Sequence, residues 1–269
     1  MPAIEVAERA RLSALLTDAV REAGALALSM FGTPIKNWTK AGASPVSEAD
    51  IAADRLLHAR LPGADAEFGW LSEESTDDPA RLAMTRLWIV DPIDGTRAYL
   101  AGLPDWTVSA ALVEHGRPVV ACLFAPVTEE LFVAVAGQGA RRNGEPIAAT
   151  SGNTIGGAQI AGPRGLLQQL ATATPPFIAA PRIRSLALRL ARVAQGTVDA
   201  AFAGPNSHDW DLAAADLLVH EAGGALTPLG GGAVTYNRPV PRHDLLVAAG
   251  RDRHAMLIDL LGDGRLACV

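Results

Sequence analysis

The chain is organised around one stretch, Trp88-Ile89-Val90-Asp91-Pro92-Ile93-Asp94-Gly95-Thr96. Its apolar and β-branched first part, with Leu87 before it, predicts a buried strand over 87–90. Pro92 fixes its own φ and disfavours helical geometry in the residue before it, so the chain is expected to turn there. Asp94 is a good helix N-cap, and the two residues after it would open a short helix. The stretch therefore predicts two carboxylates where a buried strand meets the start of a helix.

Two acidic side chains at such a junction point to chemistry on phosphate. Asp91 and Asp94 repel each other unless a cation neutralises them, and hard carboxylate oxygens suit Mg²⁺ or Mn²⁺. The unpaired N–H groups and the dipole at a helix N-terminus favour an anion. A metal that bridges protein and phosphate satisfies both conditions. Taken alone, the Asp-x-x-Asp spacing is equally well explained by an ordinary turn and a helix cap.

Composition narrows the class of protein. The 269 residues allow one large domain or two small ones, and 49% hydrophobic with 19% charged residues permit a large core. The net charge of −6 argues against binding a nucleic-acid polymer but allows a small phosphorylated substrate, because a metal can supply local positive charge. Cys122 and Cys268 form no zinc or disulfide pattern, which predicts a reduced, cytoplasmic setting. We expect neither a signal peptide nor a membrane-spanning segment.

Hydrophobic periodicity predicts alternating helices and strands. Helices are expected at 5–30, 48–60, 97–100, 165–172, 185–195, 211–222 and 251–261. Strands are expected at 35–39, 67–71, 87–90, 106–113, 118–124, 131–136, 198–202 and 245–249, with a short pair within 138–147. Composition shifts at the Ser/Gly/Thr/Asn-rich stretch 148–157, so we predict an α+β subdomain over 1–150 and an α/β subdomain over 151–269.

Three further acidic motifs could join the central pair, although each has a structural explanation of its own. Asp50 lies three residues after Ser47, which is the spacing of a capping box at a helix start. Glu73 belongs to Ser72-Glu73-Glu74-Ser75 after a predicted strand, where a solvated turn is the commoner case. Asp211 is expected to cap an alanine-rich helix, with Trp210 as a buried anchor beside the cap.

Four separated motifs, taken together, resemble the inositol monophosphatase superfamily of Mg²⁺-dependent, lithium-sensitive phosphomonoesterases. They are Ser44-Pro45-Val46-Ser47-Glu48-Ala49-Asp50, Ser72-Glu73-Glu74-Ser75, Asp91-Pro92-Ile93-Asp94-Gly95-Thr96, and Trp210-Asp211 with the ending Glu221-Ala222-Gly223-Gly224. The resemblance implies a layered α-β-α-β-α sandwich. The N-terminal subdomain would carry most of the metal ligands, and the C-terminal subdomain would complete the site. A homodimer is also implied.

The resemblance implies a set of metal ligands. Glu73, Asp91 and the Ile93 carbonyl would hold a first Mg²⁺. Asp91, Asp94 and Asp211 would hold a second. A third, weaker ion would contact Glu73 through water, so two to three ions are expected per site, with Mn²⁺ as an alternative.

The same resemblance implies the catalytic residues. The Gly95 and Thr96 amides would hold the phosphate, and Asp50 would orient the Thr96 hydroxyl. Thr96 and Glu73 together would activate the attacking water. Phosphate ester hydrolysis needs such a nucleophile, and charge stabilisation on the entering and leaving oxygens, which metal ions supply. No competing Ser, Cys or P-loop motif occurs in the sequence.

Departures from the family pattern bear on the substrate. Inositol-specific members have a glutamate about seven residues before the Trp-Asp aspartate, whereas this chain has Ala203-Gly204 in that region. Gly204-Pro205 and Ser44-Pro45-Val46 are more similar to the bacterial 3′(2′),5′-bisphosphate nucleotidases. We therefore expect a bisphosphate nucleotide as substrate, with inositol 1-monophosphate and histidinol phosphate as alternatives. Gly42 replaces an aspartate that the family usually has, which would alter the weakest metal site.

Four polar residues are expected to contact the substrate, although an ordinary polar loop explains them equally well. They are Arg184, Ser185, His208 and Asp209. A rival function from a different class is a non-catalytic regulatory binding protein on the same scaffold. That rival predicts degenerate metal ligands, and we rank it second because every expected acidic side chain is present. These side chains are Asp50, Glu73, Asp91, Asp94 and Asp211.

Overall fold

The computed structural model describes residues 6–40, 44–61 and 68–262. Within them the helices are α1 (Val6–Met30), α2 (Glu48–Arg60), α3 (Thr96–Leu100), α4 (Arg164–Ala173), α5 (Leu186–Ala194), α6 (Asp209–Glu221) and α7 (Arg251–Gly262), with 3₁₀ turns η1 (Pro79–Ala83) and η2 (Pro126–Thr128). None of these helices combines the length and apolar character that a bilayer crossing needs.

Two sheets form the framework. The seven-stranded sheet has the order β3 (Phe68–Ser72), β4 (Arg86–Asp94), β5 (Thr107–Glu114), β6 (Arg117–Ala125), β7 (Glu130–Val135), β8 (Ala140–Arg142) and β9 (Glu145–Pro146). The five-stranded sheet has the order β11 (Ile178–Ala179), β10 (Gln159–Ala161), β12 (Ala200–Ala203), β16 (Leu246–Gly250) and β14 (Gly224–Pro228). Two short antiparallel pairs lie outside them: β1 (Asn37–Thr39) with β2 (Pro45–Ser47), and β13 (Ser207–His208) with β15 (Arg242–His243).

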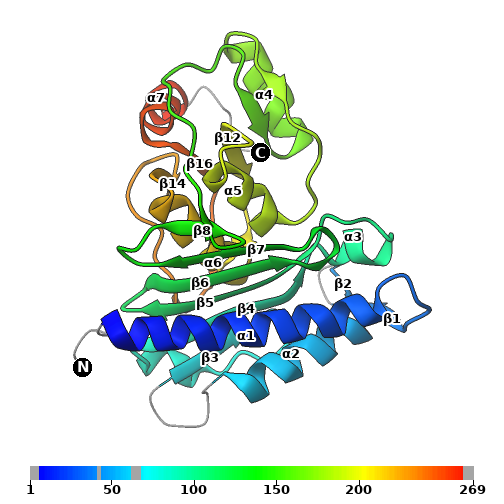
Figure 1. The fold of residues 1–269 in the computed structure, drawn as a ribbon. Coiled ribbons are helices and arrows are strands. Elements are labelled where there is room, and N and C mark those ends of the chain that lie inside the picture. The colour runs from blue at the N-terminus through cyan, green and yellow to red at the C-terminus, as the bar shows by residue number, and fades with distance from the viewer. Residues whose placement is uncertain (1–5, 41–43, 62–67, 263–269) are drawn as a thin grey trace.

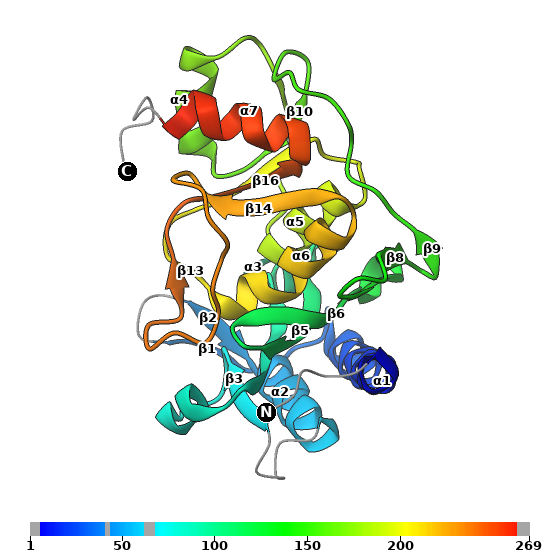
Figure 2. The same cartoon turned by 90° about the vertical axis from the view of Figure 1, so that its left-hand side faces the viewer.

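Helices and sheets stack in five layers (Figure 1; Figure 2). α1 and α2 cover one face of the seven-stranded sheet, and α5 and α6 lie between the two sheets. α4 and α7 cover the outer face of the five-stranded sheet. The predicted α-β-α-β-α sandwich is therefore confirmed.

The strand β4 is buried on both of its faces. Leu87 and Ile89 point into the core around α5 and α6, whereas Trp88 and Val90 point into the core under α1 and α2. A strand buried on both sides must be apolar throughout, which is why this stretch lacks the alternation of a half-exposed strand. β4 therefore carries its last residues, Asp91 to Asp94, into the interior of the protein.

Each predicted helix and strand is present, with ends that shift by a few residues. The sequence did not indicate β2, β10, β11, β13, β14 and β15. All of these except β14 have only two or three residues, and β14 begins with glycine and ends with proline, residues that disfavour a strand. Cys122 is buried and free, while Glu67, Cys268 and Gly42 lie outside the described residues.

Candidate active site

The central stretch carries its two aspartates on a β-bulge. Asp91 lies opposite Ser109 and Asp94 lies opposite Thr107, so β4 holds one residue more than β5 between these pairs. Residues three apart in a regular strand point to opposite faces, and the extra residue brings both carboxylates to one side. Pro92 fits here because a bulge tolerates a residue without an N–H. The predicted turn is therefore a bulge within β4, which continues to Asp94.

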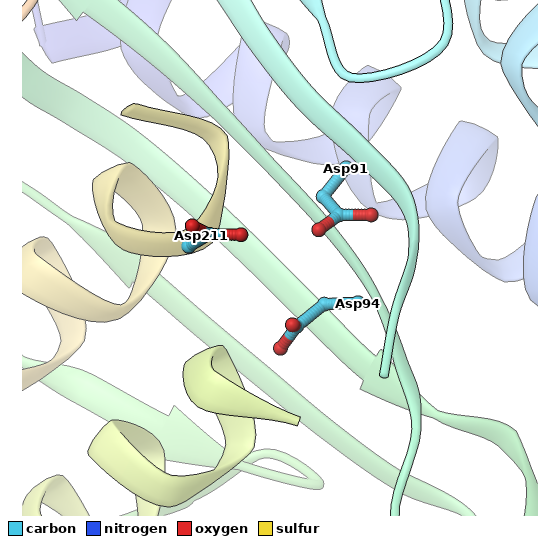
Figure 3. Close-up of side chains that lie close together, drawn as sticks. All are labelled: Asp91, Asp94 and Asp211. Carbon is cyan, nitrogen blue, oxygen red and sulfur yellow. The ribbon is translucent and has the colours of Figure 1, made fainter. Parts of the chain in front are cut away.

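Asp91, Asp94 and Asp211 converge on one point (Figure 3). Each offers a carboxylate oxygen, and these oxygens lie within 4.8 Å of one another. Asp211 comes from the first turn of α6, so the cluster joins the seven-stranded sheet to the helix layer between the sheets. Glu73 follows β3, and its N–H donates to the Val90 carbonyl at 3.2 Å. All four acids line one cavity of about 340 Å³.

Asp94 does not cap the helix that follows it, so that prediction is wrong. The N-cap of α3 is Gly95. The Asp94 carboxylate instead accepts hydrogen bonds from the N–H groups of Leu186 (3.2 Å) and Ala187 (2.7 Å) and from the Ser185 hydroxyl (2.5 Å). These groups form the start of α5, where unpaired N–H groups and the helix dipole favour a negative charge. Asp94 is thereby fixed by a helix distant in sequence.

Asp211 occupies the third position of α6 and is not its N-cap, which corrects the second capping prediction. The helix begins at Asp209, and His208 is the N-cap residue. The His208 N–H donates to Asp211 Oδ2 at 2.6 Å, which leaves the other carboxylate oxygen available to the cavity. Trp210 is half-buried and stacks on the His208 ring at 4.4 Å, so it covers the helix start without being fully buried.

Burial and mutual repulsion keep protons on this cluster. Burial, opposed by Lys40 and reinforced by Asp211, raises the pKa of Glu73 to about 8. Burial and then the charge of Asp211 raise the pKa of Asp94 to about 7. Burial, with the charge of Glu73 next, raises the pKa of Asp91 well above its ordinary value. A set of buried oxygen donors that resists ionisation in this way fits a divalent hard cation such as Mg²⁺, which would stabilise the charged forms.

A second group of contacts surrounds Thr96. Its hydroxyl donates to Asp50 Oδ1 at 3.1 Å and also lies 3.1 Å from the Ile93 carbonyl oxygen. Asp50 accepts bonds from the Ser47 N–H (2.8 Å) and hydroxyl (2.5 Å), so the predicted capping box is present. Burial raises the pKa of the Asp50 carboxyl. The expected Asp50–Thr96 contact is therefore present beside the acid cluster.

Gly95 permits its backbone to lie close to Asp105 and Ser185. Its φ is +95°, and a Cβ there would lie 3.0 Å from the Asp105 carbonyl oxygen and 3.3 Å from Ser185. Only glycine adopts this conformation without strain. The Gly95 and Thr96 N–H groups precede the first backbone bond of α3, from Ala98 N–H to the Gly95 carbonyl at 2.7 Å. They are therefore available to an anion in the cavity.

Basic side chains line the same cavity as the acids. Arg97, Arg182, Arg184 and Arg189 all contribute to its wall. Arg189 is held by bonds to the Ile183 carbonyl (2.8 Å) and the Phe202 carbonyl (3.2 Å). Sequence reasoning missed Arg182 and Arg189, because no spacing rule distinguishes an arginine at a cavity from one at the surface.

Lys40 is a further basic residue that the motifs did not single out. Its ammonium lies 2.5 Å from Glu74 Oε1 and 3.8 Å from Glu73 Oε1, and it donates to the Glu73 carbonyl at 3.0 Å. It therefore partly neutralises the glutamate pair beside the cavity. Lysine near an acidic motif in a loop gives no sequence signal that separates this role from an ordinary solvated charge.

Of the four residues expected to contact the substrate, two lie at or near the cavity and two are buried in the protein. Arg184 lines the cavity, where it pairs with Asp105 at 3.4 Å. His208 is half-buried near the cavity, with its Nδ1 3.8 Å from Asp211 Oδ2. Ser185 and Asp209 are wrong as substrate contacts because both are fully buried. The Ser185 hydroxyl holds Asp94, and Asp209 binds His243, as described below.

Comparison with known proteins gives consistent matches over most of the chain. A model of the inositol monophosphatase family matches residues 8–264. An inositol-1-monophosphatase from Rhizobium meliloti (strain 1021) is 34% identical over 236 residues, which cover 83% of this chain and 88% of that protein. The protein named Nus factor SuhB from Escherichia coli (strain K12) is 32% identical over 230 residues, covering 80% and 84% of the two chains.

A solved structure agrees with these matches. The crystal structure of extragenic suppressor protein suhB from Bartonella henselae superposes with a TM-score of 0.82 and 30% identity, over 94% of this chain and 99% of that one. The fold, the convergent acids and the sequence matches lead to the same conclusion. The chain belongs to the inositol monophosphatase family of phosphatases.

Proposed function

We propose that this protein is a Mg²⁺-dependent phosphomonoesterase whose substrate is a 3′(2′),5′-bisphosphate nucleotide. The observation that carries the proposal is that one cavity is lined both by the converging acids and by several arginines. Acids of this kind can hold a cation, and the arginines can hold an anion. A phosphate ester with a second phosphate group engages both.

Two groups of ligands would hold the metals. Glu73, Asp91 and the Ile93 carbonyl would bind one ion, and Asp91, Asp94 and Asp211 would bind the other. Bound Mg²⁺ supplies positive charge to the phosphate and lowers the pKa of water. Up to three ions are proposed, with Mn²⁺ as a substitute.

The remaining residues would orient the substrate and move protons. The Gly95 and Thr96 N–H groups donate to the phosphate oxygens. The Thr96 hydroxyl donates to Asp50, so it can take a proton from the attacking water while it passes its own proton to the Asp50 carboxylate. Glu73 is the second group able to accept that proton, once bound cations hold its carboxylate in the ionised form.

A second cavity supports a large substrate with an apolar part. It measures about 860 Å³ and shares Arg182 and Arg189 with the acid-lined cavity. Its other walls are largely apolar and include Pro163, Leu167, Ala171, Phe177, Ala179 and Ala180. Such walls suit a planar base more than a polyhydroxylated ring.

The two shared arginines suit a second phosphate. Burial lowers the pKa of Arg189, and the nearby charge of Arg182 acts in the same direction while Asp94 opposes it. Two guanidinium groups that repel each other are stabilised by an anion between them, and arginine is well matched to phosphate. This arrangement favours a bisphosphate over a monophosphate.

Specific observations favour two other candidates. The relative from Rhizobium meliloti carries the name inositol-1-monophosphatase, which keeps inositol 1-phosphate as an alternative. Histidinol phosphate stays an alternative by the resemblance alone. The relative from Escherichia coli carries the name Nus factor SuhB, which makes a regulatory binding protein a further candidate function. A purely regulatory protein would not require the acids to converge as they do here, so we rank it last. By the resemblance, we further propose lithium inhibition, a homodimer and a cytoplasmic location.

Metal removal should make stability depend on pH. In EDTA, we expect the unfolding midpoint to fall as pH rises from 5 to 8. The folded-state pKa values of Asp94 (about 7) and Glu73 (about 8) exceed their ordinary values of 3.8 and 4.5, so the folded state binds more protons in this window and loses stability as they leave. The fall, followed by circular dichroism, should be several degrees, since each kcal/mol shifts the midpoint by about 2–4 °C at this size.

The control for this experiment is the Asp94→Asn variant, which removes one of the repelling carboxylates and should flatten the pH dependence. Added Mg²⁺ should stabilise the wild-type protein more at pH 8 than at pH 5, because the ligands must lose protons to bind it. A metal-free wild-type protein that is equally stable at both pH values contradicts this explanation.

A substrate panel tests the proposed activity. With Mg²⁺ present, we expect adenosine 3′,5′-bisphosphate to have a kcat/KM at least about tenfold above inositol 1-phosphate and histidinol phosphate, since phosphate–arginine contacts contribute roughly 1.5–3 kcal/mol each. It should also exceed fructose 1,6-bisphosphate, which has two phosphates but no planar base for the apolar cavity. Asp94→Asn should lower phosphate release about 100-fold or more, because a metal ligand is lost. Much faster turnover of inositol 1-phosphate than of the nucleotide would refute the substrate assignment.

A single variant separates the second phosphate from the first. Arg182→Gln should lower kcat/KM for adenosine 3′,5′-bisphosphate by about tenfold, because one charged hydrogen bond is lost, and should leave inositol 1-phosphate turnover unchanged. Arg11→Gln, at an exposed position on α1, is the matched control and should change neither. An equal loss on both substrates would show that Arg182 does not recognise a second phosphate.

A further inference from the structure

Asp209 is a buried carboxylate whose side chain the proposed chemistry does not use. It is fully buried two residues before Asp211. Its Oδ1 lies 2.6 Å from His243 Nε2, and its Oδ2 accepts the Asn237 N–H at 2.9 Å. Arg238 donates to His243 Nδ1 at 3.2 Å, which leaves Nε2 as the nitrogen that donates to Asp209. Both carboxylate oxygens are therefore satisfied by one segment of chain.

That segment, residues 229–245, connects β14 to β16 and is called the return segment here. It binds α6 at a second point, because the Tyr236 hydroxyl donates to the buried Asp216 at 3.0 Å. Asp209 and Asp216 are seven residues apart, so they lie on one face of α6, about two turns from each other. The return segment thus lies along α6 from its first turn to its middle.

The return segment also contacts η1, which follows Glu73 in the chain. Asn237 donates to the Arg81 carbonyl at 3.0 Å and accepts from Arg81 Nη1 at 2.8 Å. Arg81 is buried in η1, and its guanidinium pairs with Asp77 at 2.6 Å. η1 packs against β3, the strand that leads into Glu73. One segment therefore ties the start of α6 to the part of the chain that carries Glu73.

Backbone hydrogen bonds to the return segment hold residues 207–209, which lead into Asp211. β13 pairs with β15, so Ser207 and His208 lie opposite His243 and Arg242. The Asp209 N–H donates to the Pro241 carbonyl at 3.1 Å. Asp211 then accepts from the His208 N–H, so its carboxylate direction follows the position of that backbone.

We propose that Asp209 and His243 are positioning residues that set Asp211 against Asp91 and Asp94 for metal binding. This inference rests on the proposed function, in which these three acids hold a divalent ion. The pair contacts neither substrate nor metal and acts through the helix start. Loss of the pair should therefore weaken metal binding directly, since groups that orient metal ligands affect affinity by about 10–100-fold.

The test measures Mn²⁺ binding to the full chain, without substrate, from the loss of the free Mn²⁺ electron paramagnetic resonance signal. His243→Leu removes the donor to Asp209 and should weaken Mn²⁺ binding about tenfold. His243→Gln keeps an N–H donor and should stay within about threefold of wild type. Asp209→Asn carries the same test as His243→Leu from the other partner, and should weaken binding by a similar factor even if the leucine variant does not fold.

Tyr236→Phe is the matched control, because it releases the same segment from the same helix at Asp216, about two turns away from Asp209. It should lower the unfolding midpoint and leave Mn²⁺ binding unchanged. Unchanged binding in His243→Leu or Asp209→Asn overturns the inference, and so does an equal loss in Tyr236→Phe, which would indicate general loosening. A wild-type protein that binds no Mn²⁺ overturns the proposed function and this inference with it.

Discussion

Repulsion between buried carboxylates is the constraint around which this structure is arranged. Asp91, Asp94 and Asp211 hold oxygens within 4.8 Å of one another, and Asp91 and Asp94 are buried while Asp211 is partly exposed. Without a cation, such a group can be tolerated only by keeping protons, which is the direction in which burial and mutual repulsion move the pKa values of Asp91 and Asp94. A divalent ion would remove the conflict by stabilising the charged carboxylates.

Each acid reaches the cluster through a different structural device. A bulge in β4 turns Asp91 and Asp94 to one side, and the start of α5 holds Asp94 with two N–H groups and a hydroxyl. The start of α6 presents Asp211, and the return segment anchors that helix. The middle helix layer therefore has two roles, since α5 and α6 fill the core between the sheets and supply helix starts to the site.

The sequence predicted the layers and the acids, and it failed where contacts span the fold. Asp50, Glu73, Asp91, Asp94 and Asp211 could be chosen because motif order and residue type are local features. The capping roles given to Asp94 and Asp211 were wrong because an aspartate near a helix start looks the same whether it caps that helix or another. The buried Ser185 and Asp209 were taken for substrate contacts because their partners lie tens of residues away. Arg182 and Arg189 were missed because an arginine at a cavity looks the same in the sequence as one at the surface.

The most direct test of this account is anomalous diffraction from crystals grown with Mn²⁺. The account predicts Mn²⁺ peaks between the carboxylates of Asp91, Asp94 and Asp211 and beside Glu73, with Mn–O distances of about 2.0–2.3 Å expected for a hard divalent ion. It also predicts that the peak beside Asp94 disappears in Asp94→Asn crystals. Mn²⁺ bound elsewhere, with these carboxylates free of metal at saturating concentration, would contradict it.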